Sequence, residues 1–201
     1  ILAKVSGTFD LNDTNIITFE ASTYTTSGNV QFDVDDDCEF STNAGKPVAK
    51  VGEQTYLTFK KASKVANAST EDVTIELAAD IELNDFITIN NTNGKNITID
   101  GANGEERYTL TMNTSVQSIL VSQRSGSITF QNMDIEHGGN QMLLRLGENT
   151  YAEGTDRALE VNLKNVDITS TSSYAYCLMG TQALGQFDIE MTDVNVDWNK
   201  T

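Results

Sequence analysis

The sequence predicts an all-β solenoid, which is a stack of coils built from short strands, and three observations carry this prediction. Residues 127–138, 159–170 and 187–198 share one pattern, in which a single Asn or Asp separates two short stretches of alternating apolar residues. Equivalent positions recur after 33 and then 28 residues, a spacing typical of solenoid repeats. The chain is also rich in Thr, Asn, Ser and Asp and has a single proline, which favours short strands and polar turns over long helices.

The residue that interrupts each pair of strands marks a sharp corner. Alternation stops at Asn132, Asn165 and Asp193 and restarts directly afterwards, because one side-chain position is consumed in the turn. Asn tolerates left-handed backbone geometry and hydrogen-bonds to its own backbone. We therefore expect these three residues to stack as a polar ladder, with the flanking apolar side chains buried in stacked rungs: Ile128, Phe130, Met133, Ile135, Val161, Leu163, Val166, Ile168, Ile189, Met191, Val194 and Val196.

The chain divides into three parts of a single domain, which we expect to be a segment of a longer protein. Residues 1–50 hold two alternating strands around a turn at 27–29, which either pair with the edge of the solenoid or form its first turns. Residues 51–70 contain the one good helix candidate, at 58–67, with Thr58 as N-cap and Phe59 on its apolar face. Residues 71–201 form the solenoid coils.

Charge and hydropathy limit the classes of partner. The formal net charge of −16 disfavours binding to nucleic acid. No run of 18 apolar residues is present, so the sequence predicts no membrane-spanning segment. Cys38 and Cys177 are too far apart for a CxxC motif, and the spacing leaves open whether they form a disulfide.

Four groups of residues are candidates for a functional site. Alternating acids offer several hard oxygen ligands for calcium, or alternatively guard an exposed strand edge by charge: Asp33, Asp35, Asp37 and Glu39. Aromatic side chains in or near the later coils are candidates for stacking on a sugar ring: Tyr151, Tyr174, Tyr176 and Trp198.

If the protein is an enzyme, the only histidine and the scattered basic residues are the candidates for catalysis: His137, Arg124, Arg145 and Lys164, with Arg157 as a further basic position. Outward-facing strand positions supply acids for such a site: Asp134, Glu160, Asp167, Asp188 and Glu190.

Residues 56–113, followed by the coil "SITFQNMDIEHG" at 127–138, resemble the pectate-lyase-like modules of bacterial and archaeal cell-surface adhesins. The resemblance covers residues 51–201 and implies a right-handed parallel β-helix whose open N-terminal end is capped by a short α-helix. It also implies a secreted or cell-surface location and a non-catalytic module that presents a rigid surface to a glycan or a protein. We expect no cofactor, apart from calcium at the acidic stretch named above.

Two alternative functions share this fold. One is a polysaccharide lyase or glycoside hydrolase, although no catalytic motif of such enzymes can be matched residue by residue. A lyase of this kind needs an Arg or Lys base opposite Asp residues that hold calcium. The other alternative is a structural subunit of a surface layer or filament. Fold alone does not choose among the three.

Overall fold

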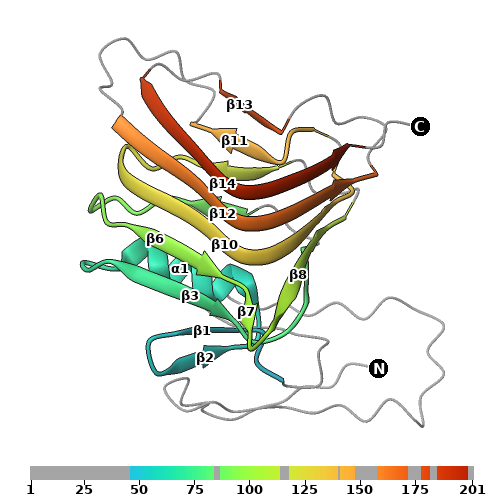
Figure 1. Ribbon diagram of the computed structural model, residues 1–201. Coiled ribbons are helices and arrows are strands. Elements are labelled where there is room, and N and C mark those ends of the chain that lie inside the picture. Colours follow the sequence, from blue (N-terminus) through green and yellow to red (C-terminus); the bar gives the residue numbers. More distant parts are fainter. Residues whose placement is uncertain are drawn as a thin grey trace, which may run out of the picture.

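The computed structural model describes residues 46–83, 87–113, 118–139, 141–147, 158–171, 178–181 and 185–198. They form a β-solenoid of about three turns with one short helix in the described part of the chain (Figure 1), which confirms the predicted all-β solenoid. The strands predicted near residues 15–23 and 29–40 lie outside the described residues.

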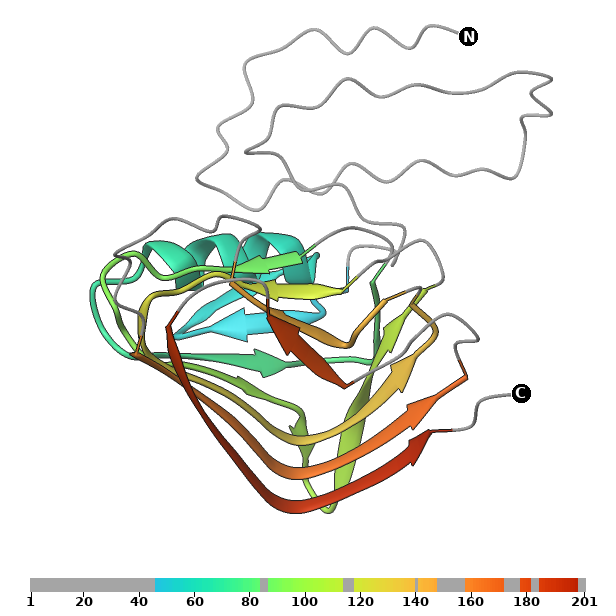
Figure 2. The same cartoon turned by 90° about the horizontal axis from the view of Figure 1, so that it is seen from above.

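The strands fall into two main groups, which the view from above separates (Figure 2). The larger sheet runs in the order β14 (Gln186–Trp198), β12 (Ala158–Ser170), β10 (Ser125–His137), β6 (Ile97–Asp100), β3 (Val73–Leu77), β1 (Ala49–Val51) and β2 (Gln54–Tyr56). Joined to it through β8 (Glu106–Met112) are β4 (Ile81–Leu83) and β7 (Ala102–Asn103). The smaller sheet has the order β13 (Met179–Thr181), β11 (Leu144–Leu146), β9 (Ile119–Val121) and β5 (Ile87–Ile89).

The three long strands β10, β12 and β14 stack in parallel and in the predicted register. Ile128 pairs with Val161, and Val161 pairs with Ile189. Beyond the corner, Met133 pairs with Val166 in the same way. The alignment of the three repeats is therefore confirmed, and each apolar position lies directly over the equivalent position of the neighbouring rung.

Burial of these positions follows the prediction in β10 and β12 but not in β14. The eight predicted core side chains of β10 and β12 are at most 1% exposed. In β14, Ile189 is 45% exposed, Met191 46% and Val196 45%, and Val194 is only partly buried, so the prediction that these four are buried was wrong. The reason is that β14 is the last strand of the sheet among the described residues, where only β12 lies beside it. Alternation identifies which face of a strand is apolar, but not whether a further rung covers that face.

The corner residues have the predicted backbone. Asn132, Asn165 and Asp193 have φ values of 52°, 54° and 52°, in the left-handed region that Asn and Asp tolerate. Asn165 Nδ2 donates to Asn132 Oδ1 over 3.0 Å, and Asn132 Nδ2 donates to Asp100 Oδ1 over 3.1 Å. The polar ladder thus continues from rung to rung, and it changes at Asp193, because a carboxylate has no N–H to donate.

The predicted helix is confirmed as α1 (Phe59–Ala68). Thr58 is its N-cap, and the Thr58 hydroxyl accepts from the Lys61 backbone N–H over 3.2 Å. Phe59 and Ala62 are buried on the face that packs against β1, β3 and β5. The segment 51–70, within which the helix was predicted, also contains β2, which pairs antiparallel with β1.

Two equivalent isoleucines test the account of burial. We expect Ile128→Ala to lower the free energy of unfolding by about 2–5 kcal/mol, through lost transfer energy and a residual cavity. Ile189→Ala should cost less than about 1 kcal/mol, because Ile189 occupies the same register position but remains substantially exposed. Denaturant unfolding of the two variants measures both values. Equal costs would contradict the conclusion that the β14 rung is open.

Candidate functional site

A hairpin interrupts the corner in the rung that precedes β10. Gln131 pairs with Asp100 and Met133 pairs with Tyr108, so residues 101–107 stand where β10 has only Asn132. These residues leave the corner as the β7–β8 hairpin, which lies beside the bend of the long strands (Figure 2). Gly101 starts the excursion, and a Cβ there would lie 2.6 Å from Met133 Cβ and 2.8 Å from the Asn132 carbonyl oxygen. Only glycine fits so close to the next rung.

The hairpin places Arg107 across the two following rungs. Its Nη2 lies 2.8 Å from Asp134 Oδ1 and also hydrogen-bonds to the Asp167 carboxylate. Its Nη1 donates to the Asn165 carbonyl oxygen over 3.3 Å and lies 3.4 Å from Asn165 Oδ1. The contact with Asp134 is an ion pair and not a hydrogen bond, and the buried Oδ1 atom of Asp134 has no hydrogen-bond partner among the described residues. One guanidinium therefore joins carboxylates from two neighbouring coils.

Around this arginine lies an open polar groove of about 1230 Å³. It is bounded by the hairpin on one side and by residues of β10, β12 and β14 on the other. The lining residues are Ala102, Gly104, Glu105, Glu106, Arg107, Asn132, Asp134, Asn165, Asp167, Met191, Asp193, Val194 and Asn195. Five of these are carboxylates and one is basic, so we expect a negative potential in the groove.

Asp167 is the carboxylate with the most defined environment in the groove. Asn195 Nδ2 donates to Asp167 Oδ1 over 2.7 Å. This hydrogen bond, followed by that from Arg107, lowers the pKa of Asp167 below its usual value. The carboxylate is therefore ionised at neutral pH and acts as an acceptor of hydrogen bonds.

The structure does not bring the predicted catalytic residues together. Arg145 lies on β11 in the smaller sheet, whereas Lys164 lies on β12 opposite Gln131. His137 ends β10, six residues beyond Gln131, which is up to about 20 Å along an extended strand. Arg124 is exposed just before β10, and Arg157 lies outside the described residues.

His137 and Trp198 pack on each other near the ends of their strands. His137 is 1% exposed, and its ring stacks on Trp198 with centroids 5.5 Å apart and planes 23° from parallel. Ser170 Oγ lies 3.1 Å from His137 Nδ1 and donates to the His137 carbonyl oxygen. Burial lowers the pKa of His137. Hydrogen bonds with the backbone of Met142 and of His137 itself act in the opposite direction but are smaller.

The remaining predicted residues are not among those described. The candidate calcium ligands Asp33, Asp35, Asp37 and Glu39 lie in the undescribed N-terminal segment, with Cys38. The aromatic candidates Tyr151, Tyr174 and Tyr176, and Cys177, lie in two undescribed segments between strands. Within the described ranges, no group of three or more His, Cys, Asp or Glu residues is placed to hold a metal ion, and no helix is long and apolar enough to cross a membrane.

Arg107 was not among the residues predicted from the sequence. The signal for it was available in the repeat pattern. When Ile97 and Ile99 are aligned with Ile128 and Phe130, the second half of the rung resumes only at Tyr108. The intervening "GANGEER" is a glycine-containing insertion at the corner, and it brings its last residue, an arginine, next to the acids of the following coils.

Burial of His137 predicts a pH dependence of stability. The folded state keeps His137 neutral to a lower pH than the unfolded state, whose pKa is near the usual 6.5. Stability is therefore fully present above about pH 6.5 and falls as the pH drops toward the lowered folded pKa, with a slope of at most about 1.4 kcal/mol per pH unit. His137→Gln should lack this component. Urea unfolding of both proteins at several pH values from 7.5 to 5.5 measures the difference, and a difference that does not change with pH would contradict the assignment.

Comparison of the chain with protein-family models, with curated proteins and with solved structures gave no significant match.

Proposed function

We propose that this chain is a non-catalytic, extracellular β-helix module of a surface adhesin-like protein, and that the groove beside Arg107 binds a glycan. The proposal includes a right-handed winding of the coils, a capping role for α1 at the end of the stack, and a secreted or cell-surface location. The observation that carries it is the fixed position of Arg107, whose guanidinium contacts Asp134, Asp167 and Asn165 from successive rungs of a stiff scaffold.

The groove has the chemistry that hydroxyl-rich ligands require. Adjacent hydroxyls of a sugar ring both donate and accept hydrogen bonds. The groove offers amide groups that donate and accept, from Asn132, Asn165 and Asn195, and carboxylates that accept, from Asp134 and Asp167. These side chains project from β-strands and hold one another through hydrogen bonds, so little conformational entropy is lost when a ligand binds.

The charge of the groove indicates which glycans fit. Five carboxylates outnumber the single guanidinium, which is already paired with two of them. A polyuronate or sulfated glycan would meet net repulsion there. The groove therefore favours neutral sugars or amino sugars over acidic polysaccharides.

Binding is favoured over catalysis by the state of the same residues. Asp134 and Asp167 lie on adjacent rungs, as a glycosidase acid pair might, but a general acid must carry a proton at working pH. The hydrogen bonds that lower the pKa of Asp167 oppose this. A lyase base must be free to take a proton, whereas the Arg107 guanidinium is engaged by two carboxylates.

Removal of the guanidinium tests the binding site. We expect Arg107→Ala to weaken binding of a neutral or amino-sugar oligosaccharide, first identified on a glycan array with the whole chain, by about tenfold or more in calorimetry. Arg107→Lys should not restore affinity, because an ammonium lacks the planar geometry that joins two carboxylates. Arg124→Ala is the matched control, since Arg124 is exposed and outside the groove. Equal affinities of the Arg107→Ala and Arg124→Ala variants would contradict the proposed site.

An activity assay separates this proposal from the enzyme alternative. The whole chain is expected to release no unsaturated uronic-acid ends from polygalacturonate or alginate, with or without calcium, and no reducing ends from neutral glycans. Ultraviolet absorbance and a reducing-sugar assay measure the two products. Product formation that disappears in Asp134→Asn and Asp167→Asn variants would establish a hydrolase or lyase in the groove instead.

A further inference from the structure

The edge of the smaller sheet at β5 is closed by a side chain. Among the described residues, β5 pairs with β9 alone, and the Ile89 carbonyl oxygen on that side accepts from the Ser122 N–H over 3.0 Å. Carbonyl groups alternate in direction along a strand, so the Thr88 carbonyl points the other way, toward the edge. An edge of this kind presents main-chain groups that a further strand can bond.

Asn67, in the last turn of α1, bonds the main chain at this edge. Its Nδ2 donates to the Thr88 carbonyl oxygen over 2.9 Å, and its Oδ1 accepts from the Asn90 backbone N–H over 2.8 Å. A carbonyl and the N–H two residues later are the pair that one residue of a parallel neighbouring strand would bond. The side-chain amide of Asn67 carries the same donor and acceptor as a peptide group, so it takes the place of that neighbour.

A second amide binds the helix from the side of the sheet. Asn91, which follows β5 and is 1% exposed, donates from Nδ2 to the Ala66 carbonyl oxygen over 3.0 Å and to the Ser69 carbonyl oxygen over 2.9 Å. The backbone N–H of Asn91 donates to Gln123 Oε1 over 3.2 Å. The contacts are therefore reciprocal: a helix side chain holds the main chain at β5, and a side chain beyond β5 holds the main chain of the helix.

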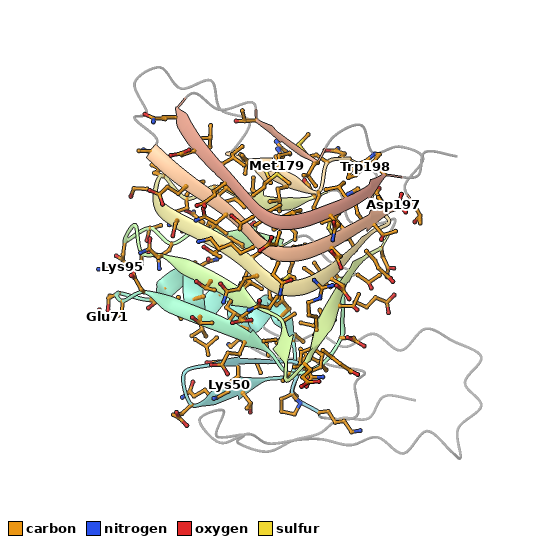
Figure 3. All side chains as sticks on the ribbon, viewed as in Figure 1. Lys50, Glu71, Lys95, Met179, Asp197 and Trp198 are labelled. Atoms are coloured by element: carbon orange, nitrogen blue, oxygen red, sulfur yellow. The ribbon has the colours of Figure 1, made fainter. Side chains whose placement is uncertain are left out.

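The turn after α1 lies against the turn after β5. Figure 3 labels Glu71 and Lys95, one in each turn, on the same side of the molecule. Asn93 joins the two turns, since its Nδ2 donates to the Ser69 carbonyl oxygen over 2.9 Å. Asn93 is exposed and its side chain makes no hydrogen bond to Thr88 or Asn90. It therefore has the same chemistry as Asn67 without the contact to the strand edge.

We infer that Asn67 closes the β5 edge against pairing with a strand of a second molecule of this chain. The inference rests on the capping role proposed for α1 and assigns part of that role to one side chain. The apolar face of α1, with Phe59, Ala62 and Ala66, covers apolar side chains of the first rungs. A helix bonds its own backbone internally, so only a side chain can satisfy the main-chain groups of the neighbouring strand.

Removal of the amide tests the inference in the whole chain. In Asn67→Ala, the Asn90 amide should exchange with solvent about tenfold or more faster, because its hydrogen bond is lost. Hydrogen exchange of the amides in β10 and β12 should be unchanged, which shows that the fold is intact. In analytical ultracentrifugation, the average mass of Asn67→Ala should rise with concentration more than that of the unaltered chain.

Two further variants isolate the contribution of the amide. Asn67→Asp keeps an acceptor for the Asn90 N–H but has no donor for the Thr88 carbonyl, so Asn90 should exchange more slowly than in Asn67→Ala. Asn93→Ala is the matched control, because it removes an amide that binds the same turn of the chain. It should alter neither the exchange of Asn90 nor the average mass.

Unchanged exchange of Asn90 in Asn67→Ala would overturn the inference, and so would association no greater than that of Asn93→Ala. Phe59→Ala separates this result from the capping role of the helix, because it loosens the buried apolar face of α1. Association of Phe59→Ala but not of Asn67→Ala would retain the helix as the cap and remove the role of Asn67. Association of neither variant would contradict both.

Discussion

The backbone corner at Asn132, Asn165 and Asp193 is the constraint on which the rest of the solenoid depends. A left-handed residue turns each long strand without ending its pairing, so one strand serves two faces of the coil. Because the corner uses one residue in each of these rungs, the apolar residues on both sides stay in register along the stack. The stacked amides then bond adjacent rungs at the point where a residue of another type would be strained.

The candidate site exists because one rung does not have a single-residue corner. In the rung before β10, the β7–β8 hairpin replaces the single corner residue. The hairpin projects from the coil next to the outward-facing acids of the following rungs. The excursion needs Gly101 for its close approach to Met133, and it ends with Arg107 directed across β10 and β12. A regular stack has flat polar sides, and the insertion forms one wall of a groove against such a side.

The alternation of apolar residues predicted the strands, their parallel register and the core of the inner rungs, because these depend on local pattern and on repetition. It did not predict the exposure of Ile189, since burial depends on a neighbour that the strand's own sequence does not encode. The site was missed for a related reason. Outward acids such as Asp134 look like ordinary solvated positions until a residue from elsewhere in the sequence, here Arg107 on the neighbouring rung, is brought against them. Trp198 was predicted to contact a ligand, and in the structure its ring stacks on His137, a neighbour that the sequence pattern did not indicate.

The span of Arg107 over three successive rungs has a mechanical consequence. The hydrogen bonds between parallel rungs run along the axis of the stack, so tension on that axis loads each ladder in turn. The guanidinium contacts add charge-assisted links in the same direction and tie the β6–β8, β10 and β12 rungs into one unit that resists separation. The β14 rung lies beyond the Arg107 contacts, so the β12–β14 ladder and the hydrogen bond from Asn195 to Asp167 carry the load at that rung.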